Sequence, residues 1–231
     1  QEAQNRGVET LVSIQYSDEW ADPGNQHAPH AWSHITNVTD LASEVYSYTY
    51  GLLDQWYTLG VLPNFVQIGN ETNINVALLP NESYSMPPVA RNAEIFNAGL
   101  NAVDQFNSVK STNVKKLIHI AGLRNAEWWM SLHHEFVNNY DVMGVSYYPN
   151  AYSESIHEVG KVISAIKATY GKDVMLVETG SPWMISGEKG DNANNMFGSF
   201  NIPIGYDNPP TELSQRNYLI DLAYTVKESG G

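Results

Sequence analysis

Short apolar runs alternate with longer amphipathic segments along the chain. The apolar runs, which predict strands, are 8–16, 64–70, 114–122, 141–149 and 173–180. The segments with apolar positions spaced near 3.6 residues, which predict helices, are 41–60, 89–110, 126–138, 155–171 and 212–230. Each predicted strand precedes a predicted helix, so the chain reads as about five strand–helix units.

The predicted strands are nearly continuous in apolar residues, which is typical of parallel strands covered on both faces. Several strand-to-helix connections are long, whereas the helix-to-strand connections are short. This asymmetry is typical of a (β/α)8 barrel, in which the loops after the strands carry function. A doubly wound open sheet is the alternative, but no glycine-rich phosphate loop follows any strand. We therefore predict an α/β fold, part of a TIM barrel, as one domain over residues 1–231.

Composition narrows the choice of partner and of chemistry. The net charge of −13 argues against binding to nucleic acid or to an anionic membrane surface. No apolar run approaches the roughly 20 residues that span a bilayer. The chain has no cysteine, which excludes a disulfide framework, a thiolate nucleophile and a Cys-ligated zinc site.

Aromatic side chains lie beside Asn, Asp and Gln in three loop-like segments, 16–32, 146–155 and 178–184. Ordinary surface packing accounts for some of these rings. A sugar, however, presents a flat face of C–H groups to an aromatic ring and a rim of hydroxyls to polar side chains. These segments therefore favour carbohydrate as the ligand.

Two predicted strands end in a glutamate, Glu71 and Glu178. Hydrolysis of a glycosidic bond needs one carboxyl group to protonate the leaving oxygen and a second to attack the anomeric carbon or activate water. The C-terminal ends of barrel strands meet at one face, where both carboxyl groups would converge. Either glutamate alone is more simply a solvated residue at a strand end, but the pair beside aromatic loops favours a glycosidase. The amide of Asn70 would then be placed to bond a sugar hydroxyl.

Four blocks, YSDEWADPGNQHAPHAW, VQIGNE, SYYP and KDVMLVETGSPW, closely resemble the arabinogalactan endo-β-1,4-galactanases, glycoside hydrolase family 53 of clan A. The resemblance covers nearly the whole chain, in order. It implies a (β/α)8 barrel that cleaves β-1,4-galactan of the plant cell wall by double displacement with retention. It also implies that the chain begins near the second helix and stops before the eighth strand, so that it contains strands three to seven.

The resemblance carries roles over by position. Glu71, on the fourth strand, is implied to be the acid/base, and Glu178, on the seventh, the nucleophile. Tyr147 or Tyr148 lies where a tyrosine usually holds the nucleophile. The remaining positions implied to bind substrate are Asn70, Asp18, Trp20, Asp22, His119 and Trp183. The charge of Glu178 should raise the pKa of Glu71, and the two carboxyl groups should lie about 5–5.5 Å apart.

No cofactor is expected for this chemistry. Residues 187–198 resemble the loop where bacterial relatives bind Ca²⁺, and Asp191 and Asn195 fit as oxygen ligands. Lys189 and Ala193 stand where further ligands would be expected, so a polar loop without calcium is favoured.

Departures from the family pattern affect substrate specificity. Gln15 replaces the usual histidine, and Leu79 replaces the usual tryptophan. Two alternatives therefore stay open: a retaining hydrolase of another β-linked hexan, and a non-catalytic carbohydrate-binding remnant. Because a polysaccharide is too large to enter a cell, we expect a protein that is secreted, periplasmic or on the cell surface, and monomeric.

Overall fold

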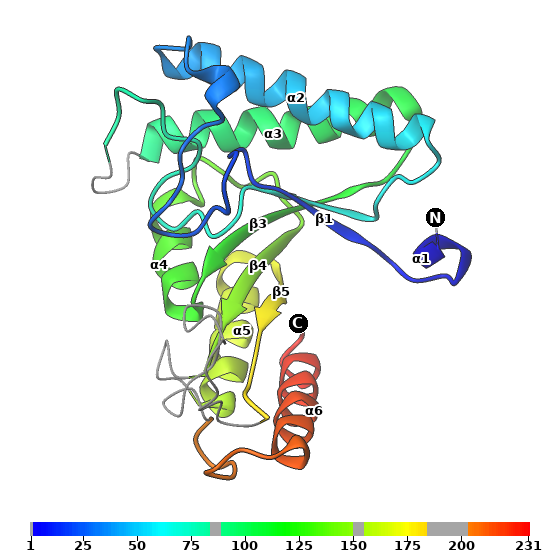
Figure 1. Ribbon diagram of the computed structural model, residues 1–231, viewed down its shortest axis with the longest axis vertical. Coiled ribbons are helices and arrows are strands. Elements are labelled where there is room, and N and C mark those ends of the chain that lie inside the picture. The colour runs from blue at the N-terminus through cyan, green and yellow to red at the C-terminus, as the bar shows by residue number, and fades with distance from the viewer. Residues whose placement is uncertain (1, 84–88, 150–154, 184–202) are drawn as a thin grey trace, which may run out of the picture.

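The computed structural model of the chain describes residues 2–83, 89–149, 155–183 and 203–231. Within these ranges the strands form one parallel sheet in the order β1-β2-β3-β4-β5 (Figure 1). The strands are β1 (Leu11–Ile14), β2 (Phe65–Ile68), β3 (Lys115–Ala121), β4 (Val142–Tyr147) and β5 (Asp173–Thr179). The helices are α1 (Glu2–Asn5), α2 (Val38–Thr58), α3 (Val89–Lys110), α4 (Leu123–His133), α5 (Ile156–Tyr170) and α6 (Glu212–Glu228), with a 3₁₀ turn η1 (His30–Trp32).

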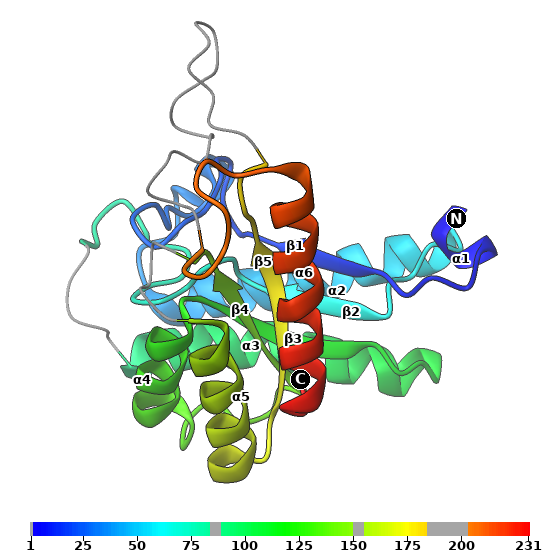
Figure 2. The same ribbon diagram turned by 90° about the horizontal axis from the view of Figure 1, so that it is seen from below.

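The strand order decides between the two architectures that the sequence left open. Every strand pairs with the next strand in sequence. The helices follow in the same order outside the sheet, where α2 packs against α3, α4 against α5 and α5 against α6 (Figures 1 and 2). A barrel winds in this way, whereas a doubly wound sheet reverses its order at a switch point. The prediction of part of a barrel is confirmed.

Burial differs between the middle and the edges of the sheet. All six residues of β4 are buried, whereas β1 is largely half-buried and β5 is half-buried or exposed at most positions. In the described part of the chain, the outer edges of β1 and β5 have no partner strand. The apolar residues of these strands are therefore only partly covered.

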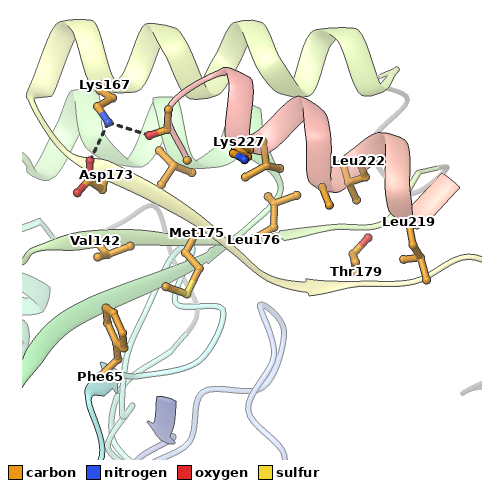
Figure 3. A pocket seen from close by; sticks show the side chains of 15 residues that line it. Phe65, Val142, Lys167, Asp173, Met175, Leu176, Thr179, Leu219, Leu222 and Lys227 are labelled. Atoms are coloured by element: carbon orange, nitrogen blue, oxygen red, sulfur yellow. Dashed lines mark hydrogen bonds and ion pairs between the residues drawn. The ribbon is translucent and has the colours of Figure 1, made fainter. Parts of the chain in front are cut away.

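A cavity of about 770 Å³ lies around β5, with Leu176 on the side of α6 and Met175 on the side of Phe65 (Figure 3). Met175 and Leu176 line it from β5, and Leu219 and Leu222 line it from α6. Neither Glu71 nor Glu178 is among its lining residues. The cavity thus belongs to the open edge of the sheet and is separate from the candidate catalytic residues.

Capping residues explain where two helices begin. The Asn37 side chain accepts a hydrogen bond from the Asp40 amide, so α2 begins before the apolar pattern does. Ser155 and Glu158 form a capping box at the start of α5, which ends at Gly171 as predicted. In these described ranges, no helix has the length and apolar character that crossing a bilayer requires.

The boundaries predicted for helix 126–138 are wrong at both ends. The helix α4 begins directly after Gly122, whose φ is 86°. After His133 the chain leaves the helix in a turn, yet Val137 is fully buried against the core. The apolar period therefore continues beyond the helix, which explains the error.

Arg91, in the first turn of α3, holds the loop that follows β2. Its guanidinium donates to the carbonyls of Val76 and Ala77 and pairs with Glu82 at 2.5 Å, and its side chain is 10% exposed. We predict that Arg91→Met lowers the free energy of unfolding by about 2–4 kcal/mol, because a half-buried carboxylate and two carbonyls lose their partner. Chemical denaturation would measure this.

The control is Arg216→Met on α6, which removes an exposed guanidinium and should change stability by less than about 0.5 kcal/mol. Equal effects of the two substitutions would contradict the assigned role of Arg91.

Candidate active site

Glu71 and Glu178 converge at the C-terminal edge of the sheet. Glu71 lies in the loop after β2, and Glu178 lies near the end of β5. One carboxylate oxygen of each and one ring nitrogen of His119 lie within 4.8 Å of one another. This closeness suits a retaining pair, whose carboxyl groups are about 5–5.5 Å apart, better than an inverting pair at about 6.5–9.5 Å.

A register shift in the sheet helps to aim Glu178. Val145 of β4 pairs with Leu176 of β5, but the next residue, Ser146, pairs with Glu178. One residue of β5 is thus left over, which is a bulge. Bulges bend a strand and redirect its side chains, and they are common beside active sites.

The backbone of Glu71 adopts a conformation that favours glycine, with φ 48°. For a residue with a side chain this region costs about 1–3 kcal/mol, so it persists only when neighbouring groups hold it. Here the Thr72 amide donates to the His119 carbonyl at 3.0 Å, and the Gln26 side chain donates to the Asn70 carbonyl at 2.7 Å. Contacts on both sides of Glu71 therefore fix the strained backbone.

The half-buried position of Glu71 changes its acidity. Burial raises the pKa of Glu71, a hydrogen bond from Ser146 opposes the rise, and the charges of Glu178 and Asp22 add to it. The direction agrees with the sequence prediction, but burial rather than the charge of Glu178 is the main cause. A raised pKa keeps this carboxyl group protonated to higher pH.

Tyr148 supports Glu178. Its hydroxyl donates to Oε2 of Glu178 at 3.0 Å, whereas Tyr147 is 1% exposed and packs in the core. Of the two tyrosines that the sequence left open, Tyr148 thus has its hydroxyl on the Glu178 carboxylate.

We predict that Tyr148→Phe lowers kcat by about 10- to 100-fold. A hydrogen bond to a charged group contributes about 1.5–3 kcal/mol, and the loss of this bond leaves the Glu178 carboxylate less well held. Steady-state hydrolysis would measure the effect. Tyr224→Phe, which removes a hydroxyl from an exposed ring on α6, is the control, and an unchanged kcat in Tyr148→Phe would refute the prediction.

The sequence model of glycosyl hydrolase family 53 matches residues 1–231. The chain belongs to this family. It is 37% identical to an arabinogalactan endo-beta-1,4-galactanase of Cellvibrio japonicus, over 99% of this chain and 60% of that protein. It is 30% identical to an endo-beta-1,4-galactanase of Bacillus subtilis, over 97% of this chain and 49% of that protein.

Solved structures show the same fold. The family 53 catalytic domain of Ignisphaera aggregans is 27% identical and superposes with a TM-score of 0.84, over 99% of this chain and 61% of that domain. A structure from a study of two fungal beta-1,4-galactanases is 22% identical with a TM-score of 0.81, over 99% and 67%, and supports the fold alone. This chain spans less than two thirds of the length of the Cellvibrio japonicus and Bacillus subtilis proteins.

The other residues predicted to bind substrate differ in how far their side chains are exposed to solvent. Trp20 and Trp183 are 72% and 49% exposed, so their rings are available to a ligand. Asp18 is exposed, and one of its carboxylate oxygens accepts from the His30 amide at 2.7 Å. Asp22 is half-buried and close enough to raise the pKa of Glu71.

Asn70 and His119 lie beneath the carboxyl pair. Asn70 is 3% exposed, and its side-chain amide donates to the Ala21 carbonyl at 2.8 Å. His119 is fully buried, with protein groups beside both ring nitrogens. This placement suits support of neighbouring groups better than direct contact with a sugar. The calcium candidates Asp191 and Asn195 lie outside the described residues.

The carboxyl pair and His119 are close enough together to be considered as a metal site. However, Nε2 of His119 lies 2.8 Å from the Ser146 hydroxyl, and Nδ1 lies 3.3 Å from the Glu71 amide. An ion would have to displace one of these groups from a fully buried ring. The arrangement therefore fits acid–base chemistry better than metal ligation.

Sequence reasoning missed three polar residues that hold the site: Gln26, Gln67 and Ser146. The Gln67 side chain lies 2.7 Å from the Ser13 hydroxyl and 3.0 Å from Oδ1 of Asn70. Its signal was available, because a glutamine inside an apolar strand is buried and needs partners. Ser146 gave a weaker signal, since serine is common beside strand ends.

Proposed function

We propose that this chain carries the catalytic pair of a retaining endo-β-1,4-galactanase. The observation that carries the proposal is the approach of Glu71 and Glu178 to within 4.8 Å at the C-terminal edge of the sheet. The substrate is proposed from the names of the relatives in Cellvibrio japonicus and Bacillus subtilis. Two exposed tryptophans, Trp20 and Trp183, offer rings to the sugar faces.

In the first step, Glu178 attacks the anomeric carbon while Glu71 gives its proton to the glycosidic oxygen. The raised pKa of Glu71 keeps that proton available. The Tyr148 hydroxyl holds the Glu178 carboxylate in place for the attack. The product is a galactosyl ester of Glu178 and a free chain end.

In the second step, Glu71, now a carboxylate, removes a proton from water, which attacks the ester. The sugar leaves with the configuration with which it entered, and Glu71 is protonated again. The two carboxyl groups supply all the acid, base and nucleophile chemistry in these steps, so we propose that no cofactor takes part. We further propose a monomer that acts outside the cytoplasm, since its substrate is a polysaccharide.

The test is hydrolysis of β-1,4-galactan, β-mannan and β-glucan, with the first-formed anomer followed by NMR. We expect galactose oligosaccharides from galactan alone, released first as the β anomer. An α anomer would refute double displacement. Cleavage of another polymer instead would favour the other-hexan alternative, and binding without products would favour the carbohydrate-binding remnant.

A further inference from the structure

Ser146 joins His119 to Glu71, and the mechanism above gives it no role. Its hydroxyl oxygen lies 2.5 Å from Oε1 of Glu71 and 2.8 Å from Nε2 of His119. Ser146 and His119 are both 0% exposed, so solvent does not compete for these hydrogen bonds. The carboxyl group of Glu71 is therefore approached from within the sheet by a buried donor.

The direction of these bonds follows from the partners of His119. Burial lowers the pKa of His119 to about 3, so the ring is neutral and carries one N–H. Its Nδ1 lies 3.3 Å from the backbone nitrogen of Glu71, whose N–H can only donate. Nδ1 therefore accepts. Oδ1 of Asn70 lies 3.0 Å from Nδ1 and 3.0 Å from the Gln67 side-chain nitrogen, whose two protons are also within reach of the Ser13 hydroxyl at 2.7 Å and the Gly69 carbonyl at 2.8 Å.

With Nδ1 accepting, the ring proton lies on Nε2 and is donated to the Ser146 oxygen. The single hydroxyl proton of Ser146 is then left for Oε1 of Glu71. His119 thus donates to Ser146, and Ser146 donates to Oε1 of Glu71.

We propose that Ser146, oriented by His119, is a positioning residue that keeps Oε1 of Glu71 occupied, so that the transferable proton sits on Oε2. The inference rests on the proposed function, in which Glu71 is the general acid. A carboxylic acid that already accepts a short bond at one oxygen carries its proton on the other. The proton is thereby presented away from the buried serine.

The same bond affects acidity. Among the described residues, the titratable groups that face Glu71 are Glu178 from β5, Asp22 from the loop after β1 and His119 from β3. The Ser146 bond lowers the pKa of Glu71, against burial and the two carboxylate charges, which raise it. Removal of the hydroxyl should therefore raise the pKa of Glu71 further. Hydrolysis requires the protonated form of Glu71, so kcat/KM falls at high pH as this group loses its proton. This basic limb of the pH profile should move to higher pH in the variant.

The test compares Ser146→Ala and Ser146→Cys with the unaltered protein on galactan and on an aryl β-galactobioside whose leaving group needs no proton. Cysteine keeps a donor at this position, although a larger and weaker one, and it decides the matter if the alanine variant does not fold. Ser131→Ala, which removes a hydroxyl bond to the Trp128 carbonyl on α4, is the matched control.

For Ser146→Ala we expect kcat/KM on galactan to fall about 10- to 100-fold and the basic limb to rise by about one pH unit. The aryl substrate should be hydrolysed at nearly the original rate, and Ser146→Cys should show the same changes more weakly. Equal losses on both substrates, or an unmoved basic limb, would overturn the proposal. If instead the unaltered protein does not cleave galactan, the proposed function fails first.

Discussion

Replacement of Glu178 by glutamine should lower kcat on β-1,4-galactan by about 10⁴-fold or more. The amide has the size of the carboxylate and keeps an oxygen for the Tyr148 hydroxyl, which lies 3.0 Å from Oε2. It cannot, however, form the ester with the anomeric carbon. Because the substitution removes a group needed only for the chemical step, the affinity for galactan oligosaccharides should stay within about twofold.

Calorimetric titration with oligosaccharides and single-turnover kinetics would measure the two quantities separately. Glu135→Gln, on an exposed side chain after α4, controls for the loss of one negative charge from a chain with a net charge of −13. Substantial turnover by Glu178→Gln would reject Glu178 as the nucleophile.

The Glu71→Gln variant should lose activity in proportion to how much its substrate needs a proton. On galactan, whose leaving group is a poor alkoxide, we expect a fall of about 10²–10⁴-fold, the usual contribution of general acid catalysis. On an aryl β-galactobioside with an acidic phenol as leaving group, formation of the ester should stay within about tenfold of the original rate. The raised pKa of Glu71 is then the origin of the basic limb, which should vanish from the pH profile of the variant.

The burst of released phenol and the later steady rate report the two steps separately, because the ester is still formed but no base assists its hydrolysis. An external anion such as azide should restore the second step and yield a β-galactosyl azide. Equal losses with both leaving groups would contradict an acid role for Glu71.

The elements of the fold could be predicted from the sequence where the spacing of apolar residues was regular. Continuous apolar runs located all five described strands, and the helical period located the long helices. The helical period gave a wrong boundary where a buried residue lies outside a helix. Val137 is such a residue, because it is buried beyond the end of α4. The helical period also failed at the start of α2, since the capping bond of Asn37 lies outside the apolar pattern.

Of the candidate site, the sequence indicated the two glutamates and not the groups that hold them. Glu71 and Glu178 end apolar strands, so their placement follows from the fold. The contact of the Tyr148 hydroxyl with Glu178 could not be predicted, because neighbours in a strand face opposite sides and a bulge can exchange them. The proposed role of Ser146 depends on the direction of hydrogen bonds that join β3, β4 and the loop after β2, which no single segment encodes.

The left-handed backbone at Glu71 has a consequence for protein engineering. At φ 48° a glycine would relieve the strain, and it would also remove a half-buried acid from beside a second carboxylate. A library selected only for resistance to heat would therefore favour the loss of the proposed acid at position 71. Stabilising selection on this protein should be coupled to a screen for turnover, because at this position folding and chemistry favour different residues.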